Sequence, residues 1–161
     1  MSKLAPTRIS RILDHFYSEI RTVFPEHQEL FDADDLFENP AEILAKGFGI
    51  VVGPGENTNR CLGNEEYYWL REFTLILTQD FLAIASDPLS KITKSKLALE
   101  WFHVLLNRLA GQNTIIVDGE TQSFKVDVTR DSGPRTITVN DAQYLFIELT
   151  VTAEYREPKT T

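Results

Sequence analysis

The pattern of apolar and polar positions predicts one long helix at residues 87–111. Asp87 is a favourable N-cap residue, Pro88 suits the first helical position, and Gly111 suits the position after the helix end, where a positive φ costs little. The apolar positions recur near helical spacing over a wide arc, namely Leu97, Ala98, Trp101, Phe102, Leu105, Leu106 and Leu109. We expect the second half of this helix to be buried and the helix to lie across a sheet.

A second, amphipathic helix is predicted near the N-terminus, at residues 6–23. Pro25 ends it, because proline cannot continue a helix. Its large apolar side chains fall on one stripe, made of Ile9, Ile12, Leu13, Phe16, Ile20 and Val23. We expect this stripe to cover one face of the sheet.

The remaining apolar runs have the period of two that is typical of strands. Strands are predicted at residues 48–52, 67–79, 114–117, 124–129, 136–139 and 144–155. In the two long strands one alternating set is apolar and the other is mixed, so one face should be buried and the other should meet water or another subunit. Residues 53–66 are rich in Gly and Asn and are predicted to form a long loop.

Together these elements predict an α+β fold, a mainly antiparallel β-sheet with a long central helix and an N-terminal amphipathic helix packed on it. The chain of 161 residues has the length of one domain. We expect a single domain over residues 1–156 and a flexible C-terminal tail over residues 157–161.

The net charge disfavours a protein that grips nucleic acid. Asp and Glu number 24 and Lys and Arg 16, for a formal charge of -8, whereas nucleic-acid binders usually carry a basic surplus. Cys61 is the single cysteine, so an intrachain disulfide is impossible and a reducing compartment fits. We expect neither a signal peptide nor a membrane span, since no long apolar run occurs.

Two charged clusters are candidates for subunit contacts. Residues 26–42 are acidic and lack Lys and Arg, and Leu36 and Phe37 stand where a calcium loop needs a ligand and a glycine, so no metal site is predicted. A basic cluster lies at the front of the long helix. The two clusters could pair between copies or could simply favour solubility. The candidate subunit or tube interface residues are Asp32, Asp34, Asp35, Glu38, Asn57, Asn59, Arg60, Lys91, Lys94 and Lys96.

The sequence does not predict an enzyme. His15, His27 and His103 lie far apart in unlike contexts, and Cys61 has no histidine near it in sequence. No HExxH, GxSxG, CxxC or P-loop motif occurs. We therefore predict no catalytic, cofactor-binding or metal-binding residues and no cofactor.

The order of the elements carries a resemblance to a known family. The segments concerned are IxxILxxFxxxI at residues 9–20, YYWLREFTLILTQ at 67–79, KLALEWFHVLLNRL at 96–109 and YLFIELTVTAEY at 144–155. In this order, and in a chain of this length, they resemble the tail terminator (tail-completion) proteins of long-tailed, lambda-like bacteriophages. The resemblance covers nearly the whole chain and rests on architecture, not on a catalytic signature.

The resemblance implies a structural virion protein that forms a ring, usually a hexamer, at the head-proximal end of the tail tube. Such a ring stops tube polymerisation and provides the surface for head attachment. Its implied partners are further copies of the chain, the tail tube protein and a head connector or head-completion protein, while DNA only passes through the lumen. The implied localisation is the virion tail, and the host cytoplasm during assembly, with no membrane contact.

Two other interpretations stay open. Within the same class, the chain could be a head–tail connector or a tail tube subunit; a tube subunit would form long polymers and a terminator only closed rings. In a different class, it could be a small-molecule-binding module or an enzyme that uses a cavity under the 53–66 loop. A ligand that raises the melting temperature would favour this last interpretation.

Overall fold

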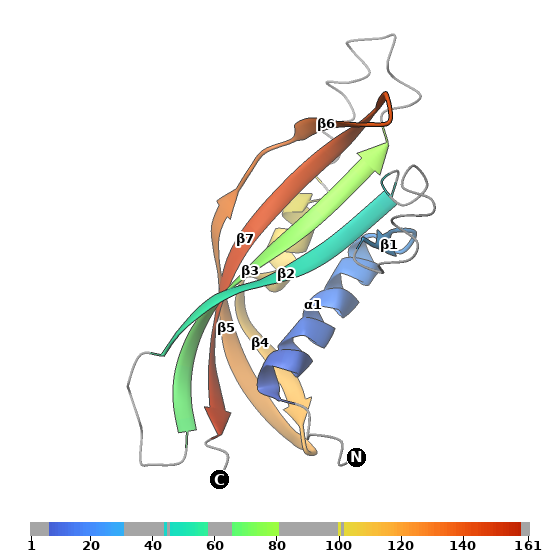
Figure 1. Cartoon of the computed structure of the whole chain (residues 1–161). Helices are drawn as coiled ribbons and strands as arrows, with labels where there is room; N and C mark the ends of the chain where they lie inside the picture. The colour runs from blue at the N-terminus through green and yellow to red at the C-terminus, as the bar shows by residue number, and fades with distance from the viewer. Residues whose placement is uncertain are drawn as a thin grey trace, which may run out of the picture.

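The computed structural model describes residues 7–30, 44, 46–57, 66–80, 100 and 102–158. These residues form the helix α1 (Arg8–Val23), a helical segment at residues 102–109 and a seven-stranded sheet (Figure 1). The strands are β1 (Gln28–Glu29), β2 (Lys46–Asn57), β3 (Glu66–Asp80), β4 (Gly111–Val117), β5 (Glu120–Asp131), β6 (Arg135–Val139) and β7 (Ala142–Pro158).

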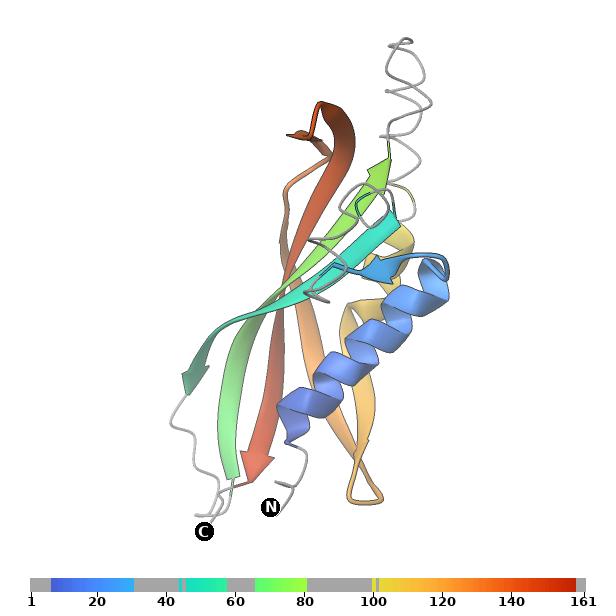
Figure 2. The ribbon, with the colours of Figure 1, turned by 45° about the vertical axis from the view of Figure 1, so that its right-hand side comes forward.

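The sheet has the strand order β1-β2-β3-β7-β5-β4, and β6 also pairs with β7. Every pair is antiparallel except β1–β2, which is parallel. The centre is the β3–β7 pair, which runs from Glu66 opposite Pro158 to Asp80 opposite Tyr144. The long strands twist and curl around α1, as Figures 1 and 2 show. The predicted α+β class and the mainly antiparallel sheet are thus confirmed.

The N-terminal helix forms as its sequence predicts, with a start at Arg8 instead of Pro6. The hydroxyl of Thr7 accepts a hydrogen bond from the Ser10 N–H at 3.3 Å and so caps the helix. At the other end the Phe24 N–H donates to the Ile20 carbonyl, just before Pro25. The predicted apolar stripe faces the sheet, with Ile12, Phe16 and Ile20 buried and Ile9, Leu13 and Val23 partly buried.

One main core joins α1, the helical segment 102–109 and a single face of the sheet, here called the inner face. The helical segment contributes Phe102, Leu105, Leu106 and Leu109. The predicted core positions of the last strand are all buried, namely Leu145, Ile147, Leu149, Val151 and Ala153. Because strand side chains alternate, the residues between these belong to the opposite face, here called the outer face.

The predicted long helix is seen only in its last part. Residues 102–109 and Glu100 are helical, residues 87–99 lie outside the described residues, and no long central helix is evident in the part that is described. Gly111 has the expected positive φ, +95°. It is also the first residue of β4, so the helical segment passes almost directly into a strand.

The prediction of a loop at residues 53–66 is wrong for residues 53–57, which continue β2, and for Glu66, which begins β3. A bulge between Val52 and Gly55 interrupts the pairing with β3 and accommodates Pro54. No described strand pairs with β2 on its other side at this point, and proline is tolerated at such an edge. Residues 58–65 lie outside the described residues.

A second, smaller cluster of buried residues contains Leu30, Leu44 and Tyr144. Tyr144 belongs to the outer face, as the alternation along the last strand predicts, and is 1% exposed. β7 ends at Pro158, beyond the predicted end at Tyr155. Within the described residues, no helix has both the length and the apolar character that a membrane crossing requires.

Candidate functional site

The predicted interface residues fall almost entirely outside the described part of the chain. Asn57 is described; it is the half-buried last residue of β2 and lies opposite Trp69. The others lie outside the described residues, namely Asp32, Asp34, Asp35, Glu38, Asn59, Arg60, Lys91, Lys94 and Lys96. That these residues form a subunit or tube interface stays a prediction.

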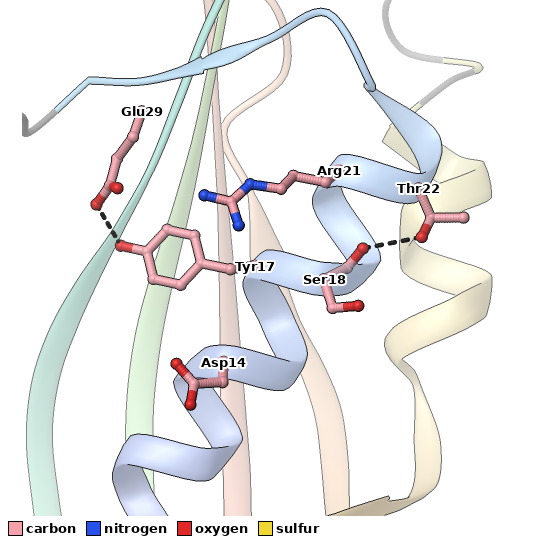
Figure 3. Close-up of a pocket in the computed structure, with 6 residues that line it drawn as sticks. All are labelled: Asp14, Tyr17, Ser18, Arg21, Thr22 and Glu29. Atoms are coloured by element: carbon pink, nitrogen blue, oxygen red, sulfur yellow. Dashed lines mark hydrogen bonds between the residues drawn. The ribbon is translucent and has the colours of Figure 1, made fainter.

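A hollow of about 680 Å³, here called the first hollow, lies on the exposed side of α1 beside β1 (Figure 3). Helical spacing of three and four residues brings five of its side chains to one side of α1. The Tyr17 hydroxyl donates a hydrogen bond of 2.9 Å to Glu29 Oε1 and so ties α1 to β1. The lining residues are Asp14, Tyr17, Ser18, Arg21, Thr22 and Glu29.

The charges in the first hollow are mixed. Burial, with the hydrogen bond to Glu29, raises the pKa of Tyr17 to about 12, so the phenol stays a protonated donor at neutral pH. The guanidinium carbon of Arg21 lies 5.9 Å from the ring centroids of both Tyr17 and Phe48. The carboxylates of Asp14 and Glu29 line the same hollow and carry the opposite charge. An open, polar surface with both signs of charge is typical of the rim of a protein contact.

Replacing Tyr17 with phenylalanine is expected to lower the free energy of unfolding by about 1 kcal/mol, because the bond to Glu29 is lost while the ring still packs. Urea unfolding followed by tryptophan fluorescence measures the change. Thr22→Val is the matched control, since it removes a local bond to the Ser18 carbonyl on the exposed side of the same helix and should cost under about 0.5 kcal/mol. Equal effects of the two substitutions would contradict this role of Tyr17.

A second hollow, of about 400 Å³, lies at the C-terminal end of α1, where the chain turns toward β1. The His27 ring centroid lies 5.0 Å from that of Phe24, and Lys46 Nζ pairs with Glu26 Oε2 at 2.6 Å. Burial, and then the positive charge of Lys46, lower the pKa of His27 to about 4, so its imidazole is neutral at pH 7. The lining residues are Val23, Phe24, Pro25, Glu26, His27, Lys46 and Gln79.

Arg71 is the centre of a polar cluster on the inner face of the sheet, near the start of β3. Its Nε donates to the Tyr155 hydroxyl at 3.0 Å, and its Nη1 donates to the Gly53 carbonyl at 3.2 Å. Its guanidinium carbon lies 5.5 Å from the ring centroid of Trp69. The alternation places Arg71 among apolar core positions but does not identify its partners. This arginine joins three neighbouring strands, β2, β3 and β7.

The outer face carries rows of polar side chains in the middle of the sheet. Glu72 pairs with Thr152, which pairs with Asp127, so two carboxylates flank a threonine across three strands. Beside this row, Thr74 pairs with Thr150. The helix α1 and the segment 102–109 pack on the inner face and leave these rows without a described helix over them. The predicted mixed character of this face is confirmed.

The three histidines occupy three separate places. The Nε2 atom of His15 lies 3.0 Å from Asn113 Oδ1, and His103 is exposed on the helical segment 102–109. His27 belongs to the second hollow. Among the described residues, no group of three or more His, Cys, Asp or Glu side chains is placed to hold a metal ion. The described part of the chain thus offers polar surfaces, and its histidines do not converge.

Comparisons with known proteins add no relative. No protein-family model matches the chain, and a search of the curated proteins finds no match. The resemblance to tail terminator proteins, with the ring and the partners that it implies, therefore stays a prediction.

Proposed function

We propose that this protein is a structural, non-enzymatic subunit that forms a closed ring at the head-proximal end of a phage tail tube. The ring would stop tube polymerisation and offer its other side to a head connector or head-completion protein. A ring of identical subunits requires each chain to present two different surfaces to its two neighbours.

The observation that carries the proposal is a sheet with two dissimilar edges. Among the described residues, no strand pairs with the outer edge of β4, or with β2 beyond Phe48. β4 contains neither a charged residue nor a proline, and Ile116 is 67% exposed on it. β2, in contrast, has a bulge and Pro54. Unlike edges favour a head-to-tail contact over a two-fold one.

The outer face supports the same proposal. Its middle rows contain Glu72 and Asp127 beside threonines, with Lys125 paired with Asp127 at 3.6 Å, and the whole chain has a net charge of -8. Carboxylates repel phosphate groups, so a lumen lined by such a face would let DNA slide without holding it.

We further propose that residues 87–99 extend the helical segment 102–109 toward the N-terminus. The extended helix would carry Lys91, Lys94 and Lys96 in its first turns. Cations are slightly unfavourable at a helix N-terminus, so an external partner would favour them there. The acidic residues 26–42 of a neighbouring copy are the partner that the charges suit.

The test is the mass of the purified protein in solution, by light scattering, together with negative-stain imaging with and without purified tail tube protein. Closed rings, or tubes capped at one end by the added protein, are the expected result. Long polymers of the protein alone would instead identify a tube subunit. A protein that stays monomeric and leaves tubes uncapped at every concentration would refute the proposal.

Reversing the charge of Lys91, Lys94 and Lys96 to Glu is expected to raise the concentration needed for ring formation by roughly 10- to 100-fold. Each exposed ion pair contributes about 0.2–1 kcal/mol, and reversal turns three attractions into repulsions. A second triple variant, with Lys3, Lys125 and Lys159 changed to Glu, carries the same net charge and serves as the control. Circular dichroism checks that both fold. Undiminished rings in the first variant would exclude this charge contact.

A further inference from the structure

We propose that the junction between α1 and β1 is an acid-sensitive latch, in which proton uptake by His27 releases residues 25–29 while the rest of the sheet stays folded. The inference concerns the fold of the single chain and holds whether or not the protein forms a ring. It rests on the surroundings of His27 in the second hollow.

The surroundings of the His27 imidazole favour its neutral form, because burial and Lys46 outweigh the Thr78 backbone and Glu26, which favour a proton. The His27 ring packs on Phe24, and the backbone of Thr78 lies beside it. Its Nε2 atom is buried and has no hydrogen-bond partner in the described structure. A neutral imidazole keeps one nitrogen without a proton, and a buried acceptor of this kind is tolerable. Protonation would turn it into a charged donor with no acceptor, which is far more costly.

The charged groups that face His27 in the described structure are Lys46 from β2 and Glu26 from the turn. The end of α1 presents the apolar Val23 and Phe24, and β3 presents Thr78 and Gln79, which do not titrate. Lys46 repels an imidazolium, and Glu26 is already paired with Lys46. The C-terminal end of a helix favours a nearby cation by about 0.3–1 kcal/mol, which is too little to offset burial here.

Phe24 is buried in the main core and Leu30 in the smaller cluster, but residues 25–29 between them are attached by few contacts. Within the described residues these contacts are the two-residue pairing of β1 with β2, the ion pair of Glu26 with Lys46, the packing of His27 on Phe24, and the bond from the Tyr17 hydroxyl to Glu29. By comparison, β3 and β7 pair from Glu66 to Asp80 without interruption. Segments with few buried contacts are the ones that open below the global unfolding free energy.

The direction of the pH effect follows from linkage. The pKa of His27 is about 4 in the closed junction, against the ordinary 6.5 of an exposed imidazole. Above pH 6.5 the closed junction has its full stability, and that stability is lost as the pH falls from 6.5 toward 4. The opening equilibrium should rise about tenfold per pH unit and roughly a hundredfold in total, after allowance for the partial exposure of the ring.

The experiment is hydrogen–deuterium exchange of the whole protein between pH 7 and pH 4.5, corrected for the intrinsic pH dependence of exchange. Peptides that cover residues 25–29 and 46–48 should lose protection as the pH falls, while those of β3 and β7 keep theirs. His27→Asn, which retains a donor beside the Thr78 backbone but does not titrate, should abolish the loss. His103→Asn, at an exposed position, is the control and should behave as the wild type.

Three results would overturn the latch. The first is equal acid sensitivity in the His27→Asn protein, which would place the cause in carboxylates elsewhere. The second is protection of residues 25–29 that persists to pH 4.5 in the wild type, or that disappears together with that of β7. If His27→Asn fails to fold at pH 7, an NMR titration of the wild-type ring decides the question. A midpoint below about 5.5 supports the latch, and a midpoint near 6.5 is the third overturning result.

Discussion

Replacing Phe16 with alanine is expected to lower the free energy of unfolding by about 3–5 kcal/mol, a large part of the stability of an ordinary domain. The side chain of Phe16 extends from α1 toward the sheet and is completely buried. Its ring meets Phe73 of β3 edge-on at a centroid distance of 5.2 Å and Phe124 of β5 at 6.2 Å. The alanine would leave a cavity among α1, β3 and β5. Both strands are fixed by their pairing with β7, so they cannot move in to close it.

Urea denaturation followed by circular dichroism measures this loss. Val104→Ala is the control, because Val104 is 50% exposed on the helical segment 102–109 and its truncation should change stability by less than about 0.5 kcal/mol. A loss below about 1 kcal/mol for Phe16→Ala would show that α1 is not anchored to the sheet in the way described.

Phe16 also illustrates what periodicity predicts well. Its place on the apolar stripe of residues 6–23 is sufficient to assign it to the core. The period of 3.6 residues is a property of the helix itself and does not depend on what the helix packs against. The same holds for the last strand, where the period of two assigns Leu149 and Val151 to the buried face and Tyr144 to the other. Long, regular segments determine these faces locally, so the sheet and α1 are predictable from sequence.

Residues 53–57 show why other parts of the fold are not predictable from sequence. Gly53, Pro54 and Gly55 are local signals for a turn, but β2 continues through them because an edge strand with a bulge tolerates proline. Whether a strand lies at an edge depends on the order of strands in the sheet, which a local pattern does not contain.

The sites were less predictable than the fold. The first hollow exists because Glu29 reaches Tyr17, and the position of Glu29 is set by the parallel pairing of Gln28 with Gly47. A two-residue strand has no periodicity from which this pairing could be predicted. The sequence predicts His27 in an acidic loop, whereas its half-buried ring packs against Phe24. The charged interface residues, apart from Asn57, lie outside the described residues and stay a prediction.

Replacing Arg71 with methionine is expected to lower the free energy of unfolding by about 2–3 kcal/mol. Methionine keeps most of the stem that packs in the inner face but removes the guanidinium. The Gly53 carbonyl and the Tyr155 hydroxyl would then lose their bonds of 3.2 and 3.0 Å, and a charged donor contributes about 1.5–3 kcal/mol. Urea unfolding measures the loss, and Arg130→Met, at an exposed position of β5, is the control.

Gly55 provides an independent way to displace the same guanidinium. A Cβ atom at Gly55 would lie 2.6 Å from the guanidinium carbon and from Nη2 of Arg71. Gly55→Ala should therefore destabilise the protein by about 1–2 kcal/mol, because the flexible arginine moves aside and gives up its two bonds. Once Arg71 is methionine, the added methyl group has no guanidinium to displace. The double variant should thus be more stable than the sum of the two losses predicts, with a coupling of at least about 1 kcal/mol. Additive losses would mean that Gly55→Ala does not destabilise the protein by displacing the Arg71 guanidinium.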